Sequence, residues 1–186
     1  LYLIKIILMK NLKFILFLCT TAILLSCGDI DNTPPYLLSI ANIAGTYEIS
    51  SLEGEENETA TTNSGAVVTV FTSKIIADSF DDVSFTLNSN GTYSATGAYR
   101  LVITETPNSG TTTTDNAIVT FDSSGTYSIN NATNTIIFTP SNDDFVEGLF
   151  EVITFNQNVV TITQKDVEIE GRITTTSTIR MGLIRK

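Results

Sequence analysis

Short runs of alternating apolar and polar residues, each followed by turn residues, constrain the fold of this chain more than any other feature. Residues 83–87 alternate with a period of two, as a half-buried β-strand does. The next residues, 88–91, end in Asn-Gly, which readily takes the positive φ angles of a tight hairpin turn. Residues 92–104 then return as a long strand. This stretch therefore predicts a β-hairpin.

The same pattern continues along the chain with almost no helical periodicity, apart from a short helical turn near residues 36–41. We expect nine or ten strands. The enrichment in Val, Ile, Thr, Tyr and Phe agrees with a β fold. The other expected strands are 43–52, 66–76, 117–121, 126–130, 135–139, 149–155, 159–164 and 172–184. Polar loops are expected at 53–65 and 107–116, with turns at 78–82 and 122–125. The pattern predicts an all-β fold, either an antiparallel barrel or a β-sandwich.

The tripeptide Gly-Thr-Tyr occurs three times, at residues 45–47, 91–93 and 125–127. Glycine frees the backbone at a turn exit, threonine begins a strand, and tyrosine is expected to enter the barrel interior. Repeated hairpin chemistry explains the motif without a ligand role. The spacing is too irregular for a propeller or a solenoid.

The final expected strand, 172–184, closes a barrel if it pairs with residues 43–52. Strict alternation places one set of its side chains inside the barrel: Ile173, Thr175, Ser177, Ile179, Met181 and Leu183. Arg180 then lies outside, or caps the end of the barrel near Tyr47.

The first part of the chain has the composition of a secretory signal. Residues 9–13 are basic, and residues 14–25 form an apolar run that is too short to span a bilayer, which needs about 20 helical residues. Residues 24–27, Leu-Leu-Ser-Cys, resemble the lipobox of bacterial lipoproteins. The resemblance implies that the thiol of Cys27 takes a diacylglycerol, and that cleavage before it makes Cys27 the mature N-terminus.

This resemblance organises the chain into three parts. We predict a cleaved signal peptide at residues 1–26, with Met9 as the true start, a lipid-anchored tether at 27–42, and the β domain at 43–186. The lipid anchor makes a membrane the first expected partner and the bacterial cell envelope the expected location. Gly28 replaces the Asp of the inner-membrane retention signal of enteric bacteria, so we expect the outer membrane, facing either the periplasm or the exterior.

Composition excludes several classes of function. Three lysines leave with the signal peptide, so residues 27–186 carry 7 basic and 20 acidic residues, a net charge of −13. So acidic a chain is a poor partner for nucleic acid, because Lys and Arg supply most of that affinity. Histidine is absent, which excludes Ser-His-Asp and Cys-His catalysis and removes the commonest zinc ligand. Cys19 leaves with the signal, so no disulfide can form within one mature chain.

A set of motifs across residues 43–184 resembles the bacterial lipocalin-like lipoproteins. They are Gly-Thr-Tyr at 45–47, Phe-x-x-Asn-x-x-Gly-Thr-Tyr at 85–93, Gly-Thr-Tyr-Ser-Ile at 125–129, Phe-Glu-Val-Ile-Thr-Phe at 150–155 and the closing strand. The resemblance implies a lipocalin-like β-barrel. In lipocalins, a Trp on the first strand packs against an Arg of the last strand. The resemblance implies that Tyr47 takes the place of this Trp, and that Arg180 is its expected partner.

Two functions follow from such a barrel. Its interior can hold a small apolar or amphipathic ligand, or its own side chains can fill the core while the outer face docks an envelope protein. Eight-stranded barrels have about the size at which either outcome occurs. An apolar cavity of about 300 Å³ or more favours ligand binding.

Three acidic clusters are candidates for a hard cation such as calcium: residues 53–58, residues 78–82, and residues 143–147. None has EF-hand spacing, and solvated charge explains them better. We therefore predict no metal site, no cofactor, no catalytic residue and no enzymatic activity. Cys27 is the one assigned site residue, and the residues of a ligand site are not identified by the sequence.

Overall fold

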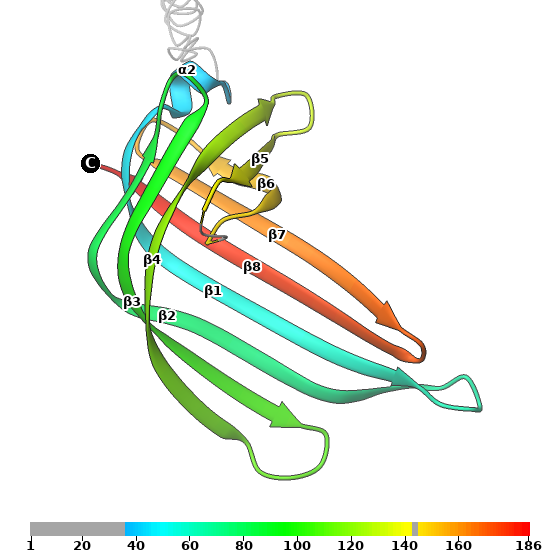
Figure 1. The fold of residues 1–186 in the computed structure, drawn as a ribbon. Helices are drawn as coiled ribbons and strands as arrows, with labels where there is room; N and C mark the ends of the chain where they lie inside the picture. The colour runs from blue at the N-terminus through cyan, green and yellow to red at the C-terminus, as the bar shows by residue number, and fades with distance from the viewer. Residues whose placement is uncertain (1–35, 143–144) are drawn as a thin grey trace, which may run out of the picture. The chain divides into compact units, whose positions relative to one another are not determined.

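The computed structural model describes residues 36–142 and 145–186. Cys27, the lipobox-like residues 24–27 and the expected signal peptide lie outside these residues. The described unit, Tyr36–Lys186, is an antiparallel β-barrel preceded by one short helix (Figure 1). Its elements are α2 (Ile40–Ile43), β1 (Gly45–Thr61), β2 (Val67–Leu87), β3 (Thr92–Pro107), β4 (Thr113–Asn130), β5 (Thr135–Pro140), β6 (Gly148–Phe155), β7 (Val159–Glu170) and β8 (Ile173–Arg185).

The barrel is closed, and each strand pairs with the next along the chain. The last strand, β8, returns to β1 in a register that runs from Tyr47 opposite Arg185 to Ala60 opposite Ile173. The predicted barrel and its predicted closing strand are confirmed, and the β-sandwich alternative is wrong. An eight-stranded up-and-down barrel fits a lipocalin-like fold.

The ten expected strands become eight because the expected turns at residues 78–82 and 122–125 remain within β2 and β4. Residues 53–61 belong to β1, although the sequence there reads as a polar loop, because this segment pairs with both β2 and β8. Residues 122–125 continue β4 through the expected turn. A Cβ on Gly125 would lie 2.2 Å from the backbone oxygen of Thr139, so the close approach of β5 explains this glycine.

The expected turn at residues 78–82 is instead a double irregularity within the single strand β2. The β2–β3 register shifts between Asp78 and Asp81 and again between Asp81 and Ser84. Ser79 and Asp82 take φ angles of 51° and 48°. Such bulges bend a strand without ending its pairing, which explains how one 21-residue strand follows the curved barrel wall.

One end of the barrel, which we call the packed end, is filled by its own side chains. The tyrosine of each Gly-Thr-Tyr motif is buried there, as predicted. Phe138 is central, with its ring edge-on to Phe85 and Tyr93 at centroid distances of 6.0 and 5.3 Å. Helix α2 lies at this end, and its Ile43 is completely buried. The packed end therefore has a continuous aromatic core.

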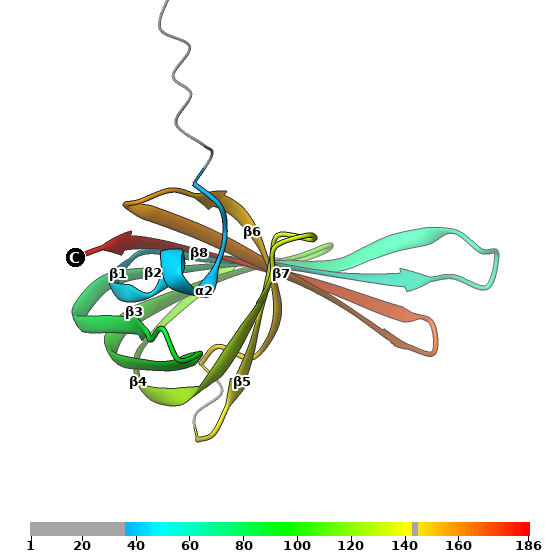
Figure 2. The same ribbon diagram turned by 90° about the horizontal axis from the view of Figure 1, so that it is seen from above.

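The other end, which we call the open end, consists of longer strands that pass beyond β5 and β6. The β5 strand has 6 residues and β6 has 8, whereas β1 has 17 and β2 has 21. On β4 and β7, pairing with β5 and β6 stops at Gly125 and Thr163, within the part of the chain that the structure describes. The hairpins of the long strands therefore project beyond the closed part of the barrel (Figures 1 and 2).

Candidate functional site

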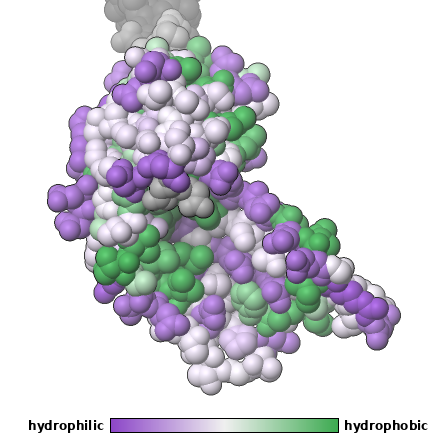
Figure 3. All heavy atoms as spheres, in the orientation of Figure 1, coloured by the Kyte–Doolittle hydropathy of each residue, from purple (hydrophilic) through white to green (hydrophobic). Residues whose placement is uncertain are grey.

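A pocket of about 640 Å³ lies where the packed end gives way to the open end. Its wall is largely apolar, and the side chains come from β1, β2, β3, β6, β8 and the segment before β6. The apolar lining residues are Leu52, Ile75, Tyr99, Leu101, Phe145, Val146, Phe150, Ile179 and Met181. Figure 3 shows a hollow in the surface below the packed end, with hydrophobic residues at its sides. An apolar lining of this size is typical of a site for a small ligand.

The register of the strands explains why these side chains converge. Leu52 on β1 is opposite both Ala77 on β2 and Met181 on β8, and directly opposed residues face the same side of a sheet. Gly54 follows on the same face, opposite Ile75 and Ile179. Because Gly54 has no side chain, the pocket keeps its depth between the two isoleucines.

One wall of the pocket is supported by aromatic packing. Phe145, which follows β5 in the chain, stacks on Phe121 of β4 with ring centroids 4.0 Å apart. The ring centroid of Tyr99 on β3 lies 5.9 Å from that of Phe121 and 6.1 Å from that of Phe145. The neighbouring Val146 is almost completely buried. This cluster joins the segment before β6 to β3 and β4.

Polar groups lie at the edge of the pocket. Gln164 and Asp166 of β7 and Glu147 contribute to the lining. The Gln164 side-chain amide donates a hydrogen bond of 2.9 Å to the backbone oxygen of Glu147. An apolar wall with a polar edge suits an amphipathic molecule, because the apolar part leaves water while the polar part remains hydrated.

Carboxylates continue from this edge along the inner face of the open end. Glu56 of β1 is opposite Ser73 and Ser177, and the Ser177 hydroxyl donates a 3.5 Å hydrogen bond to it. One step further along, Glu58 is opposite Phe71 and Thr175. The inner face also carries carboxylates from β3, β4 and β7, which are Glu105, Asp115, Asp166, Glu168 and Glu170.

The structure divides the acidic cluster of residues 53–58 between the two faces of β1. Glu56 and Glu58 point to the inner face, whereas Glu53 and Glu55 lie on the outer face, opposite Arg180 and Lys74. The division follows from a bulge between Ile49 and Ser51, which changes the inward-facing positions from odd to even numbers. The sequence alone does not reveal this separation.

The other acidic clusters do not gather at the pocket. The carboxylate of Asp78 accepts two hydrogen bonds of 2.7 Å from the Arg100 guanidinium, and these bonds lower its pKa. Asp143 and Asp144 lie outside the described residues. Among the residues that are described, no three His, Cys, Asp or Glu side chains are arranged to hold a metal ion.

The arginine that meets Tyr47 is Arg185, so the expectation of Arg180 is wrong. The Arg185 guanidinium lies 5.0 Å from the Tyr47 ring centroid and donates a 2.8 Å hydrogen bond to its hydroxyl. It also donates to the backbone oxygens of Asn42 and Ala44 at 2.7 and 2.8 Å. Burial raises the pKa of Tyr47, and the positive charge of Arg185 opposes this shift. Arg180 lies on the outer face, opposite Glu53.

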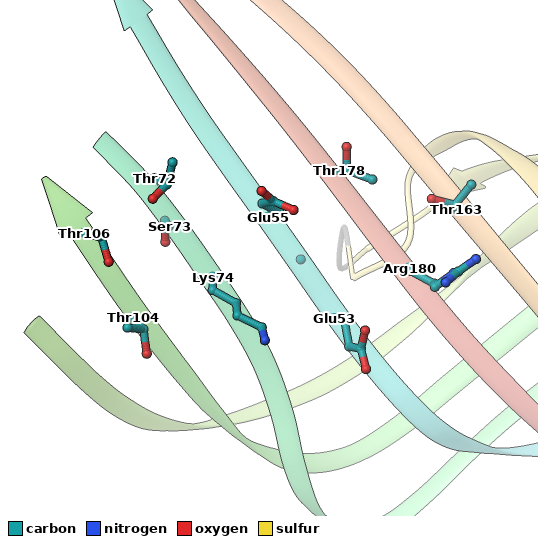
Figure 4. Close-up of a pocket in the computed structure, with 11 residues that line it drawn as sticks. Glu53, Glu55, Thr72, Ser73, Lys74, Thr104, Thr106, Thr163, Thr178 and Arg180 are labelled. Carbon is teal, nitrogen blue, oxygen red and sulfur yellow. The ribbon is translucent and has the colours of Figure 1, made fainter. Parts of the chain in front are cut away.

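A second hollow of about 720 Å³ lies on the outer face of the long strands, and its labelled side chains come from neighbouring strands (Figure 4). It is lined mainly by threonines, with Glu53 and Glu55 and the cations Lys74 and Arg180. Hydroxyls and charges of both signs are well satisfied by water. The smaller inner pocket offers more apolar surface to a ligand and is therefore the stronger candidate.

Sequence reasoning identified none of the pocket residues as a site. One signal was available, since Ile179 and Met181 were both predicted to face the barrel interior. The contributions of Leu52 and Tyr99 depend on the register of the strands, which no local pattern specifies. The contribution of Phe145 depends on the packing of its ring against Phe121.

Within the described residues, no helix has the length and apolar character needed to cross a membrane. No known protein family, curated protein or solved structure matches this chain. The fold and the geometry of the pocket are therefore what its function can be argued from.

Proposed function

We propose that this protein is a lipid-anchored, non-catalytic lipoprotein of the bacterial cell envelope, related to the lipocalin-like lipoproteins, whose barrel binds a small apolar or amphipathic ligand. One observation carries the binding proposal: an apolar pocket of about 640 Å³ opens beside a filled core. This volume exceeds the roughly 300 Å³ that a small-ligand site needs. The packed end serves as the floor of the site.

The filled core also supports a second candidate, an envelope interaction module. Phe85, Tyr93 and Phe138 leave no room for a ligand at the packed end. Exposed apolar side chains on the outside of the barrel, such as Ile118 and Leu149, could contact a protein. We favour the ligand because the inner pocket joins its apolar residues into one concave surface, whereas exposed apolar residues are ordinary on protein surfaces.

The binding test uses residues 36–186, since this unit contains the whole core and the complete closed sheet. Leu101→Trp adds a large side chain inside the pocket. The matched control is Ile118→Trp on the outer face of β4, where Ile118 is 70% exposed. With Nile red as an uncharged apolar probe, we expect Leu101→Trp to weaken binding by about tenfold or more, because the pocket loses apolar contact area. The control should bind as the unmodified chain does.

Two results would contradict ligand binding. One is an unmodified chain that fails to bind the probe. The other is a Leu101→Trp variant that keeps its fold by circular dichroism and binds Nile red with unchanged affinity. In either case the interaction module becomes the better interpretation.

The anchor is tested separately in the full chain expressed in a Gram-negative bacterium. Cys27→Ser removes the thiol that the lipobox resemblance assigns to acylation. Two or three acyl chains hold a protein firmly, at about 0.8 kcal/mol for each buried CH₂. We therefore expect the unmodified chain in the outer-membrane fraction with incorporated palmitate, and the variant unprocessed or soluble without it. A variant that still fractionates as a mature, palmitate-labelled protein would refute the anchor.

A further inference from the structure

We infer that the ligand of the open end is a cationic amphiphile, with its apolar part in the pocket and its positive head group on the inner face of the long strands. This inference rests on the proposed ligand-binding function and specifies the chemical class of the ligand. It follows from the distribution of charge between the two faces of the same strands.

All charged side chains on the inner face of the paired strands at the open end are carboxylates, among the residues that the structure describes. The register of the paired strands aligns these carboxylates in rows across the sheet. Glu105, Ser73, Glu56, Ser177 and Asp166 form one row across β3, β2, β1, β8 and β7, and Glu58 and Glu168 belong to the next row. Two further carboxylates lie on the same face: Asp115 of β4, opposite Ile103, and Glu170 of β7, opposite Ile173.

The outer face of the same strands is different. It carries the cations Lys74, Lys165, Arg100 and Arg180, together with carboxylates such as Glu53 and Glu55. Arg100 is paired with Asp78 through hydrogen bonds of 2.7 Å. The acidic composition of the whole chain therefore does not explain the inner face, since the strands place their cations on one side and leave the other side without them.

Carboxylates along a concave surface, with no cations among them, create a negative potential that attracts cations. The pocket lies directly beside them, since Asp166 belongs both to the pocket lining and to the carboxylate row. Two residues along a strand correspond to about 6.6 Å, so Glu56 and Glu58 lie within roughly 15 Å of the pocket residue Gly54. A single amphiphile can therefore contact the apolar wall and the acidic face together.

A bound metal ion fits this surface less well than an organic cation. A hard cation needs several oxygen ligands at 2.3–2.6 Å around one point. The described carboxylates include no group of three arranged in that way. Their spacing along several strands suits a diffuse charge such as an alkylammonium group, which needs no coordination shell.

The test compares three probes that share a dodecyl chain and differ in head group: dodecyltrimethylammonium, dodecyl maltoside and dodecanoate. Calorimetric titration of residues 36–186 at pH 8, below the micellar concentration of each probe, measures the three affinities. At 20 mM salt we expect the cation to bind about tenfold more tightly than the maltoside, and dodecanoate to bind most weakly. At 500 mM salt the preference should shrink, since screening weakens exposed charge interactions.

A matched pair of variants on β1 tests the placement of the head group. Glu56→Gln with Glu58→Gln neutralises two inner carboxylates, and Glu48→Gln with Glu55→Gln makes the same change on the outer face. We expect the inner pair to weaken binding of the ammonium probe by roughly three- to tenfold at low salt, with maltoside binding unchanged. The outer pair should leave the affinities of both probes within about twofold.

The outcomes separate this inference from the function on which it rests. Equal affinity for the three probes, or tighter binding of dodecanoate, would overturn the cationic ligand while leaving an apolar binding pocket. Equal effects of the inner and outer variant pairs would also overturn it, because attraction would then come from net charge alone. Failure of all three probes to bind would overturn the ligand-binding function itself.

Discussion

The two ends of this barrel are built from the same strands and differ in what their inner faces contain. On β1, the inward side chains are Tyr47 and Ile49 at the packed end but Glu56 and Glu58 at the open end. At the packed end all eight strands surround the interior, whereas at the open end β5 and β6 no longer cover the opposite side. The inner face of β1 is therefore apolar where the sheet closes around it and acidic where water reaches it.

The two ends also show how one small barrel can contain both a filled core and an open pocket. Eight strands enclose just enough space for side chains to fill it. In this protein, side chains fill that space at the packed end, and six strands continue past β5 and β6 at the open end. The pocket forms where β5 and β6 no longer cover the interior. Stability and the proposed binding site then depend on different parts of the same sheet, which makes the two parts separable by mutation.

The largest expected effect comes from a pair of truncations, one at each end. Phe138→Ala removes a ring that is 2% exposed at the centre of the packed end, so we expect a loss of about 3–5 kcal/mol in the free energy of unfolding. Leu101→Ala removes a pocket-lining side chain that is only partly buried, with an expected loss of about 1 kcal/mol. Urea denaturation of residues 36–186 measures both. Equal losses would mean that the open end is as tightly packed as the closed one.

A somewhat smaller effect is expected from the arginine that seals the packed end. Arg185→Ala removes the guanidinium donor from the hydroxyl of Tyr47 and from the backbone oxygens of Asn42 and Ala44, of which, among the described residues, only the Asn42 oxygen keeps a second donor, the Tyr36 hydroxyl. We expect a loss of about 2–3 kcal/mol. Arg180→Ala, on the exposed outer face of the same strand, is the control and should change stability by less than about 0.5 kcal/mol. Thermal unfolding of both variants measures the difference in stability between them. The seal would lose its support if the two variants melted at the same temperature.

The smallest expected effect is a dependence on alkaline pH that arises at the packed end. Burial raises the pKa of Tyr127 to about 12, and its hydroxyl donates a 2.8 Å hydrogen bond to the backbone oxygen of Asn88. The unfolded chain releases this proton near pH 10, so the folded state holds it longer. Stability from this group is therefore complete below pH 10 and is lost as the pH rises toward 12. Tyr127→Phe should flatten the stability curve in this window, and an unchanged slope would remove Tyr127 as its source.

Much of the closing strand could be predicted from its sequence, because alternation alone decides which side chains share a face. Met181 and Leu183 are buried, as that alternation predicts. The same parity could have identified Arg185, two residues after Leu183, as the partner of Tyr47. Arg180 has the opposite parity and cannot reach that side of the sheet. Approximate position along the strand suggests Arg180, whereas the face of the sheet identifies Arg185.

The glutamates of β1 could not be assigned to faces from the sequence. Counting by two from Tyr47 and Ile49 places Glu53 and Glu55 inside, yet the bulge between Ile49 and Ser51 brings Glu56 and Glu58 inward instead. The residues around the bulge, Ser50 and Ser51, carry no signal that distinguishes a bulge from regular strand. One extra residue thus determines which carboxylates face the pocket.

The sequence by itself determined the β class of the fold, the hairpin at residues 88–91, the closing strand and its inward face, because these follow from periodicity and turn chemistry within a few neighbouring residues. Only the tertiary structure decided that residues 53–61 and 122–125 remain in the sheet, that Arg185 meets Tyr47, and that an apolar pocket opens beside an acidic face. These features depend on register between strands distant in the chain. Register is a property of paired strands, and no single segment contains it.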